Sequence, residues 1–166
     1  QILVLYSFFP IILTQFFEKY NINIPVYEIN PIWYAFVIFS FNTTAVLIEV
    51  FRSALKTVDK GQLEAAQSVG LTGFQSYRRI IIPQSLVVAL PNLCTTTVNL
   101  IKGTSLGFAF SLPEITLRAK VAANVGYNYV EAYIDIFFVY LILCISVEYL
   151  FKWLENRLKR YKYLEA

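Results

Sequence analysis

The chain has 166 residues, of which 57% are hydrophobic and only 15% are charged, and its mean hydropathy is +0.56. This composition excludes an ordinary water-soluble protein, and the length suits a single domain. The net charge of +3 is too small, and too concentrated in loops and at chain ends, to predict nucleic-acid binding. The sequence therefore predicts a membrane protein, whose many aromatic residues line the bilayer interfaces and pack between helices.

Four segments are apolar enough to cross a bilayer, which takes about 20 residues for ~30 Å of hydrocarbon. We expect one all-α domain over 1–166, with spans at about 1–17, 32–55, 84–110 and 129–150 and a polar loop at about 57–83. Pro10 interrupts the first span, and a membrane helix tolerates proline where neighbours satisfy the freed carbonyl. Trp33 and Tyr34 resemble interfacial anchors at the start of the second span. A short amphipathic piece, roughly 113–123, precedes the fourth.

The placement of basic residues predicts the orientation. Ten lie in or beside the central loop and in the C-terminal tail, namely Arg52, Lys56, Lys60, Arg78, Arg79, Lys152, Arg157, Lys159, Arg160 and Lys162. The connections on the opposite side hold three, Lys19, Arg118 and Lys120. Since cytoplasmic loops carry the excess of Lys and Arg, we expect the central loop and the C-terminus in the cytoplasm.

The central loop carries the signals of two short helices. Asp59 is a candidate helix cap, with Gln62 placed to complete a capping box. Gly70 is placed to end this helix in a left-handed turn. Thr72 and Gln75 repeat the capping pattern for a second helix. The loop therefore predicts a helical hairpin that rests on the membrane surface or on another protein.

Polar residues recur along the third span at steps of three and four, so they share one helix face; they include Asn92, Thr95, Asn99 and Lys102. Hydrogen bonds between helices explain the threonines without any solute. Lys102 is harder to explain, because a charge at depth costs roughly 2.5–3.5 kcal/mol. It either extends to the outer interface or lines a polar cavity.

Two further groups belong to the same interpretation. Thr104 and Ser105 follow Lys102 and Gly103, where they can loosen the helix and present backbone groups to a solute. Asn42, Thr43 and Thr44 give the second span a polar patch that either faces the same interior or packs against a neighbouring helix.

Nothing in the sequence predicts catalysis. The chain has no histidine, which excludes His-dependent triads and His-metal sites. Cys94 and Cys144 lack any partner spacing, the carboxylates are scattered, and no P-loop is present. We therefore expect neither catalytic residues nor a metal or cofactor in this chain.

The central loop has the pattern E-A-A, three residues, G, nine residues, I-x-hydrophobic-P, formed by Glu64, Ala65, Ala66, Gly70, Ile80, Ile82 and Pro83. This pattern resembles the EAA loop of permease subunits of bacterial ATP-binding cassette importers. The flanking sequences IIIPQSLVVALPNL and NLIKGTSL are similar to the polar amino acid uptake branch. The resemblance runs from the second to the fifth span of a five-span subunit, so we expect that this chain, which begins at Gln1, lacks a first span.

The resemblance implies the type I importer membrane fold, in the inner membrane of a bacterium. It implies a dimer with a second copy or a homologue, two cytoplasmic ATP-binding subunits that bind the ATP, and an extracytoplasmic solute-binding protein. The EAA segment would be a coupling helix docked in the ATPase through Glu64, Ala65, Ala66, Gly70, Ile80 and Pro83. The translocation pathway would include Asn42, Asn92, Thr95, Asn99, Lys102, Thr104 and Ser105.

The resemblance also implies that the transported solute is a polar amino acid. Relatives often carry an acidic residue directly after the lysine equivalent to Lys102, and this chain has Gly103 there. The KGTSL sequence in this chain is similar to the corresponding sequence of permeases for cystine.

The residues alone leave two other functional classes open. A secondary transporter or channel for a small polar solute would explain the polar helix face, and a membrane-anchored assembly subunit would explain the loop.

Overall fold

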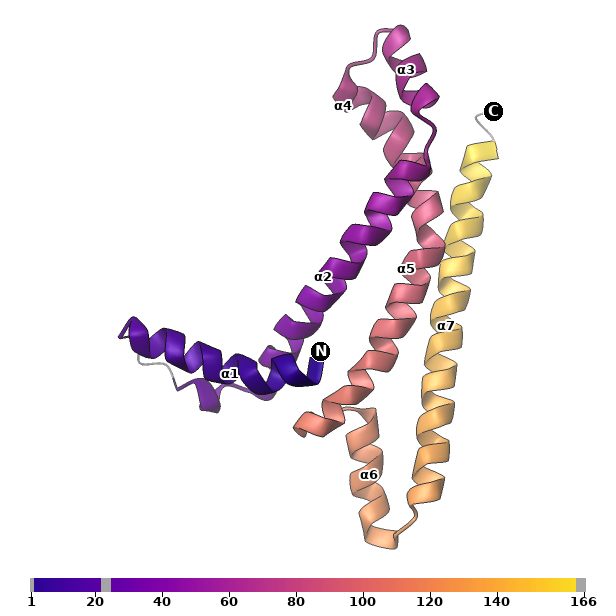
Figure 1. Ribbon diagram of the computed structural model, residues 1–166. Coiled ribbons are helices and arrows are strands. Elements are labelled where there is room, and N and C mark those ends of the chain that lie inside the picture. Colours follow the sequence, from indigo (N-terminus) through magenta and orange to yellow (C-terminus); the bar gives the residue numbers. More distant parts are fainter. Residues whose placement is uncertain (1, 22–24, 164–166) are drawn as a thin grey trace. The chain divides into compact units, whose positions relative to one another are not determined.

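The computed structural model describes residues 2–21 and 25–163, and every element in them is helical. In chain order the elements are α1 (Ile2–Lys19), η1 (Val26–Glu28), α2 (Pro31–Thr57), α3 (Lys60–Ser68), α4 (Gly73–Ser76), η2 (Tyr77–Ile81), α5 (Ile82–Thr104), η3 (Ser105–Phe110), α6 (Ile115–Gly126) and α7 (Tyr129–Tyr163) (Figure 1). The predicted all-α class is confirmed. The contacts divide the chain into a first unit, Gln1–Thr44 with Leu100–Leu141, and a second unit, Ala45–Asn99 with Ile142–Ala166. The single domain over 1–166 stays a prediction.

In the described part of the chain, three helical stretches are long and apolar enough to cross a membrane: Pro31–Thr57, Gly73–Phe110 and Tyr129–Lys159. They contain the second, third and fourth predicted spans. The first predicted span does form a helix, α1, but α1 is not among the three, so the structure supports three spans where four were predicted. At 18 residues, with Glu18 and Lys19 at its end, α1 is at the short limit for a crossing.

The helix continues unbroken from Gly73 to Phe110, so the loop joins the third predicted span without a break, and the boundary between them stays a prediction. The turn before α5, η2, is a π-helix in which the Ile82 N–H bonds the Tyr77 carbonyl. Pro83 has no N–H, and in an α-helix its ring would clash with the carbonyl four residues earlier. The wider π turn accommodates the proline, so the hairpin joins α5 without a break.

Aromatic contacts hold the first unit together. Tyr6 of α1 stacks on Phe110 at the end of η3, with ring centroids 3.7 Å apart. Phe9 meets Tyr34 of α2 edge-on at 5.9 Å, and the Tyr34 hydroxyl donates to the Val26 carbonyl. Tyr34 and Val26 are both buried. These contacts fix the start of α2 against α1 and η3.

In the second unit, α3, α4 and η2 form a hairpin (residues 60–81) that connects α2 to α5 (Figure 1). Its interior is made of small and aliphatic side chains: Ala66, Ser76 and Ile81 are buried, and Ser76 is completely inaccessible. The Ser76 hydroxyl donates to the Thr72 carbonyl at 3.0 Å, which satisfies the buried oxygen. Small residues let the two arms approach closely, so the hairpin is compact.

Candidate functional site

The two arms of the hairpin begin at different caps. The Asp59 carboxylate accepts the Gly61 N–H at 2.9 Å, so the predicted capping box with Gln62 is not formed. At the second arm the box is complete: the Thr72 hydroxyl accepts the Gln75 N–H at 3.4 Å, and the Gln75 side chain accepts the Thr72 N–H at 3.0 Å. Both predicted helix starts are confirmed, and the second is the better fixed.

Gly70 turns the chain between the two arms. Its φ is +89°, the left-handed region that a glycine adopts without strain, as predicted. The Gly70 N–H donates to the Gln67 carbonyl at 2.9 Å, and the Leu71 N–H donates to the Ala66 carbonyl at 3.1 Å. This pair of bonds is the Schellman motif, which satisfies carbonyls that a helix end otherwise leaves open.

The residues predicted to contact the ATPase differ in their solvent exposure. Glu64, Ala65, Gly70 and Pro83 are exposed, and Ile80 is half-buried. Ala66 is only 3% exposed, so this side chain packs inside the hairpin and is not available to a partner.

Two apolar side chains that the motif did not indicate are the most exposed on the hairpin. Val69 is 79% and Phe74 is 75% exposed, on either side of the Gly70 turn. One feature of the sequence could have indicated their exposure. Val69 adjoins the turn glycine and Phe74 lies close to the Thr72 cap, and both are apolar residues in an otherwise polar loop. Val69 and Phe74 give the hairpin an apolar tip.

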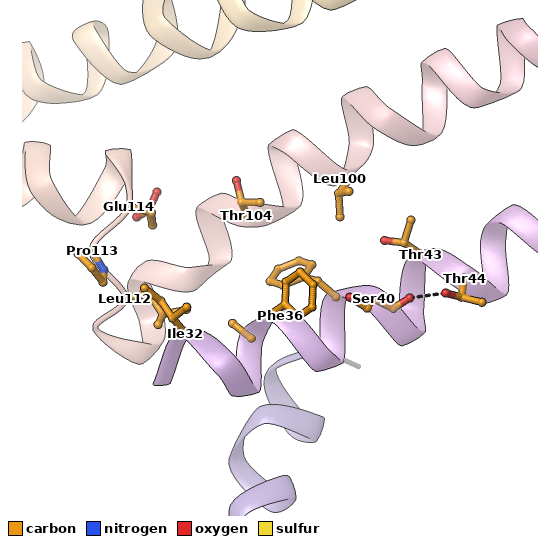
Figure 2. A pocket seen from close by; sticks show the side chains of 12 residues that line it. Ile32, Phe36, Ser40, Thr43, Thr44, Leu100, Thr104, Leu112, Pro113 and Glu114 are labelled. Carbon is orange, nitrogen blue, oxygen red and sulfur yellow. Dashed lines mark hydrogen bonds between the residues drawn. The ribbon is translucent and has the colours of Figure 1, made fainter. Parts of the chain in front are cut away.

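A cavity of about 590 Å³ lies within the first unit, between α2 and the segment that runs from α5 to α6 (Figure 2). It is lined by Ile32, Ala35, Phe36, Phe39, Ser40, Thr43, Thr44, Leu100, Thr104, Leu112, Pro113 and Glu114. The α2 residues follow each other at steps of three and one, which puts them on one helix face. The wall is therefore mostly apolar, with a few hydroxyl groups and one carboxylate.

The hydroxyl groups of the cavity fall into two kinds. Those of Thr44 and Thr104 donate to carbonyls of their own helices, each at 2.7 Å. Those of Ser40 and Thr43 make no hydrogen bond to any residue that the structure describes. The latter two can bond a ligand through both the hydrogen and the oxygen.

Glu114 is the acidic residue of the cavity and the N-cap of α6. Its carboxylate accepts the Thr116 N–H at 2.8 Å and the Leu117 N–H at 2.7 Å, and the Tyr140 hydroxyl donates to it at 3.3 Å. Gly107 leaves the space for it: a Cβ there would lie 3.2 Å from Leu112 Cδ1 and 3.5 Å from Glu114 Cγ. The carboxylate is therefore held in one place from several sides.

The structure brings one predicted pathway residue, Thr104, to the cavity wall. Asn42 precedes Thr43 on α2, about 100° around the helix from it, and does not line the cavity. The Ser105 hydroxyl donates to the Lys102 carbonyl at 2.7 Å. Lys102 itself is exposed and makes no ion pair with any residue that the structure describes.

The other predicted pathway residues, Asn92, Thr95 and Asn99, lie on the part of α5 that belongs to the second unit, and all three are exposed. The Thr95 hydroxyl donates to the Pro91 carbonyl at 3.1 Å, so its proton is used within the helix. The role of these residues in a pathway stays a prediction. Among residues 2–21 and 25–163, no group of three His, Cys, Asp or Glu side chains can hold a metal ion.

Comparison with known proteins gives one consistent family. Residues 2–160 match the family described as binding-protein-dependent transport system inner membrane component. The L-cystine transport system permease protein TcyL of Bacillus subtilis is 32% identical over 164 residues, which are 93% of this chain and 69% of TcyL. The probable amino-acid ABC transporter permease protein YckA of the same organism is 36% identical over 135 residues, 81% of this chain and 60% of YckA.

A solved structure agrees with these relatives. A crystal structure of an amino acid ABC transporter with histidines superimposes with a TM-score of 0.66 and 29% sequence identity, over 85% of this chain and 64% of that one. The chain thus spans between 60% and 69% of the length of these three proteins.

Proposed function

This chain belongs to the family of inner membrane components of binding-protein-dependent transport systems, and from this we propose that it is the permease subunit of an ATP-driven amino acid importer. The match over residues 2–160 carries the proposal, because it covers the three apolar helical stretches and the hairpin together. Its relatives are named for transport of L-cystine and of other amino acids, which supports a polar amino acid, such as cystine, as the solute.

The hairpin would couple the permease to a separate cytoplasmic ATPase that binds the ATP. Three features support this role: the turn is rigid because Gly70 and the Thr72 cap fix it, its arms are short, and its tip exposes Val69 and Phe74. Apolar side chains that stand out of a polar surface are typical of residues buried in a partner. Glu64 is exposed on α3, and its carboxylate would place a negative charge at the edge of this contact.

The proposed mechanism is alternating access. Closure of two ATPase subunits on ATP would draw the docked hairpins of two permease copies, or of this chain and a homologue, toward each other. The attached spans would tilt and open the pathway to a loaded extracytoplasmic solute-binding protein, and hydrolysis would reset it. The permease would make different contacts in the two states, which is what couples them. We place the hairpin and the C-terminus in the cytoplasm, on the count of basic residues.

The proposal is tested by uptake of radiolabelled L-cystine and other amino acids into proteoliposomes that contain the permease, its ATPase and the binding protein. We expect uptake that requires ATP and stops in Glu64→Lys and Gly70→Trp, while both variants still assemble with correctly inserted spans. Uptake driven by an ion gradient without the ATPase would contradict the proposal, and so would normal ATP-driven rates in both variants.

A further inference from the structure

We propose that a patch on the C-terminal part of α7, formed by Lys152, Trp153, Asn156 and Arg157, binds the headgroup of an anionic phospholipid. The inference goes beyond the proposed function, because it concerns the lipid around the permease and not the solute that passes through it. A headgroup bound there would anchor the end of α7 at the membrane surface.

The helix α7 is longer than one membrane crossing needs. Its 35 residues extend over about 52 Å at 1.5 Å per residue, whereas the hydrocarbon layer is about 30 Å thick. Residues 136–147 carry no charge, so this run marks the middle of the span. A crossing of about 20 residues centred on it ends at position 151, and the patch follows directly. The patch therefore lies at the depth of the phospholipid headgroups, where tryptophan is enriched, and this depth favours a lipid over a cytoplasmic protein as the partner.

The patch occupies one face of the helix. Each residue turns an α-helix by about 100°, so its four residues fall within an arc of about 140°. All four side chains are exposed, and that of Trp153 is 55% exposed. Phe151, Leu154 and Leu158 share the opposite face and are half-buried. The apolar face of α7 is thus partly covered by the protein, while the patch is open to its surroundings.

The patch carries two positive charges that no carboxylate in the described chain neutralises. Lys152 and Arg157 make no ion pair with any residue of 2–21 and 25–163, although Glu148 lies one turn before Lys152. The other nearby acid, Glu155, is bound to Lys159 at 2.5 Å, about 160° around the helix from Arg157. A phosphate group would supply the missing negative charge.

Trp153 holds the guanidinium of Arg157 in place. The guanidinium carbon lies 5.3 Å from the centre of the indole ring, which is a cation–π contact. This contact uses no hydrogen-bond acceptor, so the N–H groups of Arg157 remain available for two parallel hydrogen bonds to a phosphate. The Lys152 ammonium and the Asn156 amide add donors on the same face.

The fluorescence of Trp153 can report which lipid lies beside it, because the chain has only one other tryptophan, Trp33. The complex of permease and ATPase is placed in nanodiscs of phosphatidylglycerol and phosphatidylcholine, with bromine on the acyl chains of one lipid or the other. Bromine quenches a nearby indole, so the two quenching curves give the relative binding constant of the lipids at that indole. Subtracting the emission of the Trp33→Phe/Trp153→Phe double variant from that of Trp33→Phe isolates Trp153 from the tryptophans of the ATPase.

We expect phosphatidylglycerol to be preferred at Trp153 by at least about fivefold. The preference should weaken severalfold at high salt, because the charges are partly exposed to water. Lys152→Gln and Arg157→Gln should each lower the preference by at least about twofold, and together they should bring it to about one.

Two controls separate a site from the general charge of the surface. Trp33 is 61% exposed at the start of α2, where the first Lys or Arg that follows is Arg52, and in Trp153→Phe it should show no preference for either lipid. Lys159→Gln removes the same charge from the same helix but leaves the patch intact, so it should retain most of the preference at Trp153.

Equal quenching of Trp153 by the two lipids overturns the proposal, and this measurement needs no charge variant, so it remains decisive if Arg157→Gln does not fold. The same preference at Trp33, an unchanged preference in the Lys152→Gln/Arg157→Gln variant, or an equal loss in Lys159→Gln and Arg157→Gln also overturns it. If neither lipid quenches Trp153 in the complex but both do in the permease alone, the patch contacts the ATPase, and the proposal is again overturned.

Discussion

Gly70 sets the geometry of the hairpin through its backbone alone. Its φ of +89° disfavours any residue with a Cβ, yet a Cβ there would meet no atom within 4 Å. A substitution at Gly70 therefore strains the backbone without causing a clash. Gly73, three residues later at the start of α4, is equally open, and its φ lies outside the left-handed region. The two glycines differ in backbone conformation and not in the room available to a side chain.

This pair gives a prediction at the residue scale. Gly70→Ala should reduce the local stability of the hairpin by about 1–2 kcal/mol, the cost of the left-handed region for an L-residue. Gly73→Ala should leave it unchanged or stabilise it by up to about 1 kcal/mol, since alanine favours the helix. Amide hydrogen exchange of the hairpin in the purified permease measures both. Equal effects of the two substitutions would contradict the assignment of Gly70 as the left-handed turn.

At the scale of elements, the π-helix η2 decides how the hairpin is joined to α5. It holds one more residue in its turn than an α-helix does and ends immediately before Ile82 and Pro83. Each residue turns a helix by about 100°, so the extra residue fixes the direction in which the hairpin points relative to α5. The apolar tip at Val69 and Phe74 takes its orientation from this turn.

Deleting Arg79 should therefore uncouple transport. Without the extra residue the turn becomes α-helical and rotates the hairpin about α5 by about 100°, while the spans keep their sequence. We expect ATP-driven uptake to fall at least about tenfold, with normal membrane insertion. Arg79→Ala, which removes the side chain and keeps the residue, is the control and should retain most of the uptake. Normal uptake in the deletion variant would show that the orientation of the hairpin is immaterial.

At the scale of the whole molecule, the count of basic residues predicts which side of the membrane each connection faces. Val69 on the hairpin and Val125 at the end of α6 are 79% and 91% exposed, so a cysteine at either position is accessible to a reagent on its own side. Cys94 and Cys144 are replaced by serine to leave one thiol.

In intact cells whose outer face is made accessible, a membrane-impermeant maleimide should label Val125→Cys and not Val69→Cys. Val69→Cys should react only after the inner membrane is permeabilised, in cells that express the permease without the ATPase subunit that would otherwise cover the tip. Labelling of Val69→Cys from outside would invert the topology and remove the hairpin from the ATPase.

Local signals predicted much of this fold. The cap at Thr72, the turn at Gly70 and the starts of α2 and α7 depend on residues within one or two turns of each other, and the structure has them close to the predicted positions. The ion pair of Glu49 with Arg52, three residues apart, is also local and is formed at 3.5 Å. Short-range geometry is the part of a structure that sequence patterns encode most directly.

The remainder depends on contacts between distant segments. The cavity joins α2 to residues 56 to 82 positions further along, and only the packing of the first unit decides which face of α2 meets them. Asn42, Thr43 and Thr44 were selected together for their polarity, and only the two threonines have the helix phase that reaches the wall. Glu114 gave no signal, because a carboxylate before a helix is ordinarily only a cap. Ala66 matched the motif but packs inside the hairpin.

The central claim is that the apolar tip of the hairpin is held by an ATPase. The most direct measurement places a photoreactive amino acid at Phe74, which is 75% exposed, and irradiates intact membranes that contain the complete transporter. The account predicts that the main adduct contains the ATP-binding subunit, and that its yield changes when ATP is added. Adducts with lipid or with extracytoplasmic proteins, and none with an ATP-binding subunit, would contradict it.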